Sequence, residues 1–298
     1  MFNIITANEP LTVTNLKGLI YGDPGAGKTS IANTANNAIT LDFDKGAHRS
    51  EFRQNVFVVE SWKQITENSN EFYKAISSYD TIVIDTADRM LSYMGIYAIA
   101  KNGRLATNKL QWYGAIKDMF SLFVNNLMTM NKDIIFIAHV KEKDEGDYRI
   151  KRPAIMGGSY DTVLQACDYV GFASFRGDVR TLNFNPSEYH VGKNSAKLPC
   201  LDVPDFHSNP NWFNDILTNM KNSINDLTEA QRQTLESLKM YQNDVNECDT
   251  IASLNAIVES LKTEKSYIKQ QVWVGMEIKA KELNCTFNKT TKLFEPVI

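Results

Sequence analysis

Cysteine and histidine are scarce in this chain of 298 residues, which contains four of each. The four cysteines, Cys167, Cys200, Cys248 and Cys285, are widely spaced and form no CxxC pair. This spacing argues against a disulfide framework and against a zinc site. The histidines form no helical i, i+4 pair and have no carboxylate partner at metal-ligand spacing. The sequence therefore disfavours a transition-metal enzyme.

Long apolar runs are also missing. No stretch reaches the roughly 18 residues that a helix needs to span a bilayer. The first 15 residues, MFNIITANEPLTVTN, contain neither the basic region nor the apolar region of a signal peptide. We therefore expect a cytoplasmic protein with no membrane partner.

Charge of one sign is not in large excess. The chain has 32 Lys and Arg residues against 35 Asp and Glu residues, so its formal net charge is −3. Such a balance gives no general attraction for a polyanion, and any nucleic-acid site must be a local basic patch. Composition leaves nucleic-acid binding open.

Short apolar, β-branched runs are present at residues 16–22, 37–44, 55–60, 79–86 and 133–140. Their apolar residues are continuous instead of alternating, which is typical of strands covered on both faces in a parallel sheet. Most intervening segments are long enough for helices. The pattern predicts a doubly wound α/β core.

An antiparallel edge is predicted next to this parallel sheet. The polar residues 141–159 read as a loop, and a short helix follows them. The run DYVGFASFRGDVRTLNFNP, residues 168–186, then places Gly177 and Asp178 at a hairpin turn.

The character of the sequence changes near residue 222, after the turn-rich stretch LPCLDVPDFHSNPNWF. Polar helices follow, and the pattern of Thr228 and Gln231 in LTEAQRQTLESL predicts a capped helix start. We expect a core at residues 1–221 and a small helical C-terminal module at residues 222–298.

The stretch YGDPGAGKTS, residues 21–30, fits the phosphate-binding pattern G-x-x-x-x-G-K-[ST]. Its glycines let backbone N–H groups face a phosphate, Lys28 reaches the β and γ phosphates, and Thr29 offers a hydroxyl to Mg²⁺. The flanking strand and helix make a chance glycine turn the weaker interpretation. The predicted nucleotide-binding residues are Gly22, Asp23, Pro24, Gly25, Ala26, Gly27, Lys28, Thr29 and Ser30.

A second part of the site is predicted at the end of another strand. TIVIDTADR places Asp85 where a P-loop ATPase needs a carboxylate that holds Mg²⁺ through water. Thr29 and Asp85 are therefore the predicted metal site. The alternative is that Asp85 only caps the next helix.

Together these stretches resemble the RecA-type recombinases, and particularly the phage-encoded RecA-like single-strand annealing proteins, over roughly residues 17–200. The resemblance implies a RecA-like P-loop NTPase core of α/β class, in which helices flank a mostly parallel sheet with an antiparallel edge. It also implies ATP and Mg²⁺ as cofactors and ATP hydrolysis that DNA stimulates.

The resemblance further implies catalytic roles beside that of Lys28. In LDFDKGAH, Asp44 stands where the family usually has the glutamate that activates the attacking water. His139, at the end of IIFIAHV, matches the residue that senses the γ phosphate. Lys193 in EYHVGKNSAKLP matches a lysine that reaches the ATP of a neighbouring subunit, although Ser195 replaces its companion lysine. Structural roles for all three residues stay open.

Two basic segments match the DNA-contacting loops of the family. One, residues 141–158, also contains Tyr148 as a stacking surface, and the other is residues 100–109. From composition alone, solvated surface charge explains them equally well. The predicted DNA-binding residues are Lys101, Arg104, Lys109, Lys141, Lys143, Arg149, Lys151 and Arg152.

The resulting hypothesis is an ATP-dependent single-stranded DNA-binding protein of phage type, active in recombination or annealing in the host cytoplasm. Expected partners are single-stranded DNA and further copies of the chain in a ring or filament, with a single-strand-binding protein as another candidate. Two alternatives stay open. One is a RecA-fold helicase or helicase loader, and the other is an ATP-controlled protein-interaction switch that does not involve DNA.

Overall fold

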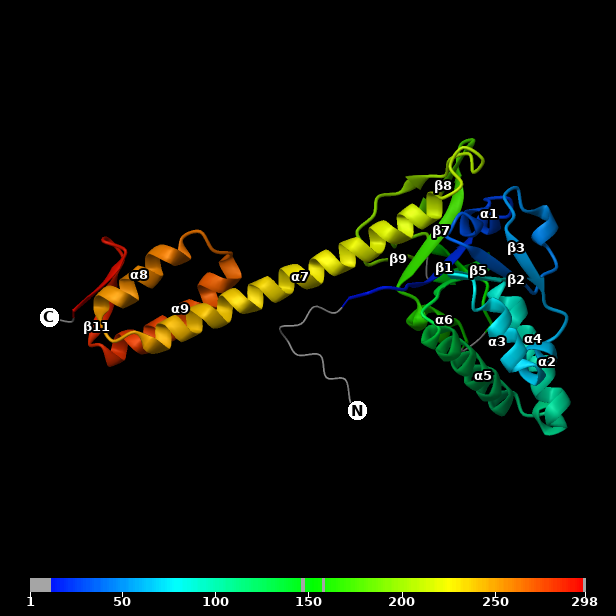
Figure 1. Ribbon diagram of the computed structural model, residues 1–298, viewed down its shortest axis with the longest axis horizontal. Helices are drawn as coiled ribbons and strands as arrows, with labels where there is room; N and C mark the ends of the chain where they lie inside the picture. The colour runs from blue at the N-terminus through cyan, green and yellow to red at the C-terminus, as the bar shows by residue number, and fades with distance from the viewer. Residues whose placement is uncertain (1–11, 146–147, 157–158, 297–298) are drawn as a thin grey trace. The chain divides into compact units, whose positions relative to one another are not determined.

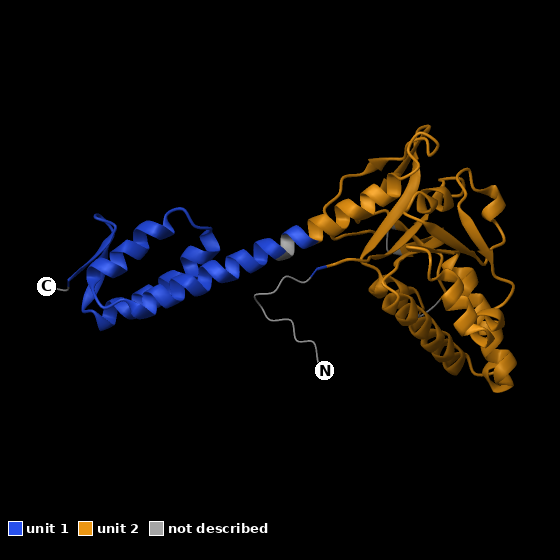
Figure 2. Ribbon diagram, in the orientation of Figure 1, with its two compact units in different colours: residues 1–12, 225–298 blue, residues 13–224 orange. Residues whose placement is uncertain are grey.

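The computed structural model describes residues 12–145, 148–156 and 159–296 (Figure 1). Two compact units are distinguished (Figure 2): one is Val13–Ile224, and the other contains the chain from Asn225 onward. The helix α7, Trp212–Glu247, begins in the first unit and ends in the second.

The first unit is built on one twisted sheet with the strand order β10-β8-β7-β1-β5-β4-β2-β3. Neighbouring strands from β7 to β3 run parallel, whereas β8 and β10 form an antiparallel edge. Two further strands pair outside this order, β6 with β5 and β9 with β7. The strands are β1 (Lys17–Gly22), β2 (Ala38–Asp42), β3 (Asn55–Val58), β4 (Thr81–Asp85), β5 (Asp133–Glu145), β6 (Tyr148–Pro153), β7 (Tyr169–Arg176), β8 (Val179–Asn183), β9 (Lys193–Asn194) and β10 (Leu201–Asp202).

Helices cover both faces of this sheet (Figure 1). On β1, Leu19 and Tyr21 pack into the cluster that contains residues of α4 and α5, while Ile20 packs into the cluster with α1 and the start of α7. Both faces of the strand are buried, which explains its continuous apolar sequence. The helices of this unit are α1 (Lys28–Asn33), α2 (Trp62–Glu67), α3 (Ser69–Ile76), α4 (Ala87–Lys101), α5 (Lys109–Thr129) and α6 (Ser159–Ala166), with short 3₁₀ turns at Ala47–Arg49 (η1) and Gly103–Ala106 (η2). The predicted α/β class with an antiparallel edge is confirmed.

The segment expected as a loop after the fifth strand is largely a β-hairpin. β5 continues to Glu145 and pairs antiparallel with β6. Polar residues can form these strands because the hairpin places opposite charges together: Arg149 contacts Glu142 and Asp144 on the facing strand. Four residues of the expected loop, 146–147 and 157–158, lie outside the described residues.

The second unit differs from the expected helical module in two ways. The predicted helix start at Thr228 is wrong, because the backbone of α7, which contains no glycine or proline, continues through it. A hairpin of β11 (Cys285–Asn288) and β12 (Leu293–Pro296), which the sequence pattern did not reveal, follows the helices α8 (Ile251–Leu261) and α9 (Ser266–Glu282). Residues of these elements and of the end of α7 share one apolar cluster.

Within the described part of the chain, no helix has the length and apolar character needed to cross a membrane.

Close packing at Gly18 gives a test of the sheet arrangement. A Cβ atom at this position of β1 would lie 1.8 Å from the buried ring of Tyr169. We expect Gly18→Ala to lower the free energy of unfolding by about 1 to 3 kcal/mol, because the ring has no free space to enter. Urea denaturation would measure the change.

Gly114→Ala is the matched control, since no heavy atom lies within 4 Å of a Cβ at this exposed position of α5. Alanine there should raise stability by about 0.5 to 1 kcal/mol. Equal effects of the two substitutions would contradict the packing described for β1 and β7.

Candidate nucleotide-binding site

The turn between β1 and α1 forms a compact phosphate loop. Gly25 and Gly27 have φ angles of 77° and 78°, which side chains with a Cβ rarely adopt. The backbone N–H of Asp23 donates to the carbonyl of Ala173 on β7 at 3.0 Å and fixes the loop to the sheet. The sequence thus places glycine where the turn requires it.

Lys28 is only 8% exposed and lies inside this loop. Its Nζ donates to the carbonyl oxygens of Gly22 and Asp23 at 3.1 and 3.0 Å. Burial lowers the pKa of Lys28, while the carboxylates of Asp85 and Asp23 oppose that change. The ammonium is therefore held by neutral carbonyls, and the phosphates of a nucleotide would be stronger partners.

Thr29 and Asp85, the predicted metal site, are in direct contact. The Thr29 hydroxyl donates to Asp85 Oδ2 at 2.6 Å. Burial raises the pKa of Asp85, the hydrogen bond from Thr29 opposes this, and Asp42 and Asp44 raise it further. A hydroxyl and a carboxylate are suitable oxygen ligands for Mg²⁺. The alternative role for Asp85 is wrong, since the side chain that caps α4 is Thr86, which accepts from the N–H of Arg89.

The two acidic residues at the end of β2, Asp42 and Asp44, have different surroundings. Asp42 is buried and accepts from the N–H groups of Gly46 and Ala47 at 3.1 and 2.9 Å, so it shapes the turn. Asp44 is half-buried and lines the cavity beside the phosphate loop, where Arg49 contacts its carboxylate at 3.1 Å. Of the two, Asp44 is therefore the one that lines the cavity.

His139 lies at the level of Gly22, its partner in the register of β1 and β5. The sequence predicted that the strand ends at this residue, but β5 continues into the hairpin with β6. The His139 side chain is exposed and lines the same cavity, while its carbonyl accepts from the N–H of Ala154 at 2.7 Å.

The cavity has a volume of about 530 Å³ and brings together Lys28, Thr29, Asp44, Asp85 and His139. It is lined by Pro24, Gly25, Gly27, Lys28, Thr29, Ser30, Asp44, Gly46, Arg49, Ser50, Glu51, Asp85, Thr86, Ile137, His139 and Arg180. The other three predicted nucleotide contacts do not line it: Gly22 and Asp23 have their carbonyls on Lys28, and Ala26 is buried in the core.

Three charged residues of this cavity were not predicted. Arg49 and Glu51 follow β2 in the chain, and Arg180 comes from β8 on the antiparallel edge. Neither segment has a motif that signals nucleotide contact, and only the fold brings Arg180 beside the phosphate loop. Arg180 and Glu51 form an ion pair of 2.7 Å.

Lys193 does not line the cavity. Its strand β9 pairs with the beginning of β7, where Lys193 faces Val170. On the other side of β7, Val170 pairs with Leu19, which lies three residues before Gly22, so Lys193 is not at the level of the phosphate loop. The ammonium donates to the carbonyl of Cys167. The role expected across a subunit boundary concerns a second copy of the chain and stays a prediction.

The predicted DNA-contacting cations of the β5–β6 hairpin have partners within the chain. Arg149 contacts Glu142 and Asp144, Lys151 contacts Asp23 at 3.1 Å, and Arg152 lies over the ring of Tyr160. Lys141 donates to the carbonyl of Ile155 at 2.7 Å, and its pKa is lowered by burial and by Arg152. Lys143 also belongs to β5, and the side chain of Tyr148 lies outside the described residues.

The other basic segment joins α4 to α5. Lys101 at the end of α4 lies 3.5 Å from Glu67 and over the ring of Tyr97. Arg104 in η2 and Lys109 at the start of α5 are exposed. DNA binding by either segment stays a prediction.

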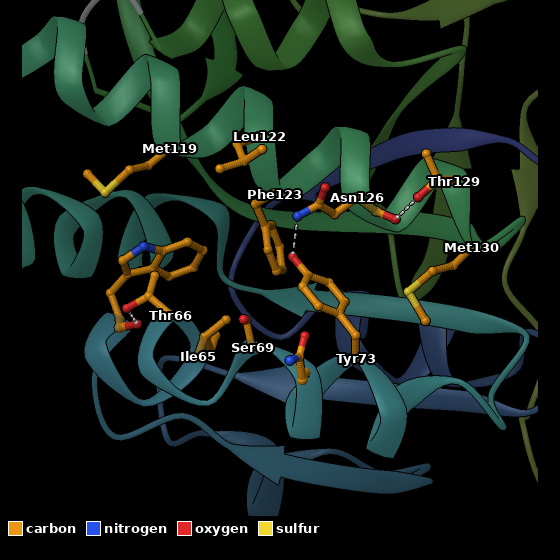
Figure 3. A pocket seen from close by; sticks show the side chains of 12 residues that line it. Ile65, Thr66, Ser69, Tyr73, Met119, Leu122, Phe123, Asn126, Thr129 and Met130 are labelled. Atoms are coloured by element: carbon orange, nitrogen blue, oxygen red, sulfur yellow. Dashed lines mark hydrogen bonds between the residues drawn. The ribbon is translucent and has the colours of Figure 1, made fainter.

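A second cavity, of about 630 Å³, lies between α2, α3 and α5 (Figure 3). Its lining is mainly apolar, with Tyr73 and Asn126 joined by a hydrogen bond of 3.1 Å. No carboxylate, lysine, arginine or histidine is among its lining residues, so it offers no charged side chain to a phosphate or a metal ion. The lining residues are Trp62, Ile65, Thr66, Ser69, Asn70, Tyr73, Met119, Leu122, Phe123, Asn126, Thr129 and Met130.

Comparison with known families agrees with the phosphate loop. Residues 14–196, well over half of the chain, match the family AAA_24, described as an AAA domain. The chain belongs to this family. Its first unit is therefore an AAA-type P-loop ATPase core, built on the mostly parallel sheet with an antiparallel edge that the sequence predicts.

The crystal structure of the KaiC-like protein PH0186 from Pyrococcus horikoshii OT3 aligns with 13% identity and a TM-score of 0.33. The alignment covers 57% of this chain and 78% of that protein. No curated protein matches the chain.

The raised pKa of Asp85 predicts how stability depends on pH. The pKa of an aspartate in an unfolded chain is about 3.9. Burial raises the pKa of Asp85 in the folded state, so the folded state binds the proton more tightly than the unfolded state does. Stability is therefore lost as pH rises from the unfolded pKa through the folded pKa. Asp85→Asn should therefore raise the melting temperature of the ligand-free protein at pH 7.

The gain from Asp85→Asn should disappear near pH 3, where the aspartate is protonated in both states. Asp178→Asn, in an exposed turn, is the control and should change stability little at either pH. A less stable Asp85→Asn protein at pH 7 would contradict the burial assigned to this carboxylate.

Proposed function

We propose that this protein is an Mg²⁺-dependent ATPase that binds single-stranded DNA and promotes annealing or strand pairing, as phage RecA-like proteins do. The AAA family and the phosphate loop support the ATPase part. The DNA part rests on the resemblance and on the ion pair between Lys151 of the β5–β6 hairpin and Asp23 of the phosphate loop. Assembly of several copies and contact with a single-strand-binding protein belong to the same proposal.

The residues of the cavity support ATP hydrolysis in separate ways. Lys28 would exchange its two carbonyl partners for the β and γ phosphates, which carry more negative charge. Thr29 and Asp85 would hold the metal, which neutralises charge on the phosphates when bound. Asp44 would orient a water molecule and accept its proton.

One observation supports coupling to DNA: Lys151 of the hairpin forms an ion pair with Asp23 of the phosphate loop. The Tyr21 hydroxyl, just before the loop, also donates to the carbonyls of Lys151 and Val191 at 3.1 and 2.7 Å. A change in the loop on ATP binding would therefore reach the hairpin directly. Linkage requires the reverse effect as well, so DNA on the hairpin would alter ATP binding.

The protein-interaction switch stays the second candidate, and the pairing within the hairpin favours it. Arg149 is already matched by Glu142 and Asp144, and Lys151 by Asp23. These carboxylates reduce the net positive charge that the hairpin presents, and with it the attraction for the phosphates of DNA. In that case ATP would set the shape of the hairpin for a protein partner.

Steady-state ATP hydrolysis with and without single-stranded DNA tests the proposal. We expect single strands to stimulate turnover and duplex DNA to have little effect. Lys28→Ala is the blank and should reduce turnover by about a hundredfold or more, since it removes the cation from the phosphates. Turnover that responds to no DNA would favour the switch, whereas directional unwinding would favour a helicase.

Arg104 and Lys109 provide a separate test of DNA contact, because they are exposed. Replacing both by alanine should weaken single-strand affinity and reduce its salt dependence by about 0.7 in log–log slope for each lost phosphate contact. Fluorescence anisotropy at several salt concentrations would measure both effects. Lys63→Ala with Lys74→Ala, on α2 and α3, is the charge-matched control. The same slope in both double variants would remove residues 100–109 from the DNA-binding surface.

A further inference from the structure

Arg180 adds a third cation, after Lys28 and Arg49, to the wall of the nucleotide cavity, and no sequence motif predicts it there. Its side chain is 35% exposed, and its guanidinium contacts Glu51 Oε2 at 2.7 Å. Both residues line the cavity. They come from opposite parts of the core, since Glu51 follows the second strand of the chain and Arg180 belongs to the antiparallel edge strand β8.

The Arg180 side chain passes directly beside the phosphate loop. A Cβ atom built on Gly27 would lie 3.8 Å from Arg180 Cδ and 3.7 Å from the ring of Phe206. The N–H groups at this end of a P-loop face the α and β phosphates of a nucleotide. The guanidinium is attached next to Cδ, so it is within reach of the same phosphates.

Glu51 is held at the cavity by the first turns of α1. The hydroxyls of Ser30 and Ser50 lie 2.9 Å apart, and the N–H of Phe52 donates to Ser30 Oγ at 3.2 Å. These contacts fix the chain on both sides of Glu51. In the ligand-free protein the carboxylate therefore neutralises Arg180 at the place where a nucleotide brings phosphate.

For Arg180, exchange of Glu51 for a nucleotide phosphate is chemically favourable. Arg180 and Glu51 are about one-third and one-half exposed, and an ion pair of such exposure contributes little stability. A guanidinium binds phosphate oxygens through two parallel hydrogen bonds, in a geometry that suits it well. Glu51 is thus a weak competitor for Arg180.

We propose that Arg180 binds the α or β phosphate of ADP and ATP, and that it breaks its ion pair with Glu51 to do so. This role rests on the nucleotide site of the proposed function but is independent of DNA. Glu51 then acts against nucleotide binding, so substitutions at the two ends of one ion pair should have opposite effects.

Titration calorimetry with Mg²⁺–ADP tests this role without any need for hydrolysis. Arg180→Ala should weaken ADP binding by about ten- to a hundredfold, the usual loss for a charged hydrogen bond. Arg180→Lys keeps the charge but not the paired hydrogen bonds, and its loss should be smaller. Glu51→Gln should tighten binding several-fold because Arg180 no longer has a competing anion.

Arg176→Ala is the matched control. Arg176 ends β7, the strand that pairs with β8, and forms an ion pair of 2.6 Å with Asp202, but it does not line the cavity. This variant should bind ADP as the wild type does. Thermal denaturation of every variant shows whether the fold is retained.

Three results would overturn the inference. If Arg180→Ala folds and binds ADP with wild-type affinity, Arg180 does not contact the nucleotide. If Glu51→Gln weakens binding as much as Arg180→Ala does, the ion pair only supports the wall of the cavity. A wild-type protein that binds no ADP would overturn the proposed ATP site itself, and this role with it.

Discussion

The hydrogen bond between Thr29 and Asp85 joins the start of α1, which follows β1, to the end of β4, a strand that is not a neighbour of β1 in the sheet. Thr29 follows β1, Asp85 ends β4, and β5 lies between these strands. The parallel register brings their ends to one level, where His139 on β5 faces Gly22 and Ile137 faces Asp85. The site depends on this alignment, because the phosphate loop, the predicted metal ligands and His139 converge only if all three strands run in the same direction.

Charge compensation inside the chain characterises this site. Lys28 is held by carbonyls, Asp44 contacts Arg49, and Arg180 contacts Glu51. Each contact satisfies a group that would be costly to leave unpaired in a partly buried cavity. The partners of the two cations Lys28 and Arg180 carry less negative charge than a nucleotide phosphate. Each cation could therefore exchange its partner for a phosphate.

The sequence predicted the parts of the site that depend on local chemistry. Glycines and Lys28 mark the phosphate loop, and continuous apolar runs mark the parallel strands, because both patterns are required by neighbouring residues. The β5–β6 hairpin was missed, since its strands are stabilised by cross-strand charge pairs such as Arg149 with Asp144 instead of an apolar face. Arg180 could not be predicted, because its distance from the loop is set by the packing of β7 and β8 and not by its sequence neighbours.

The most direct test of the account is a crystal structure with Mg²⁺ and a non-hydrolysable ATP analogue. We expect Lys28 Nζ to have left the carbonyls of Gly22 and Asp23 for the β and γ phosphates, with the metal ion bound between Thr29 and Asp85. A nucleotide bound elsewhere, or bound in this cavity while Lys28 keeps both carbonyl contacts, would contradict the central claim that residues 22–30 and Asp85 form the ATP site.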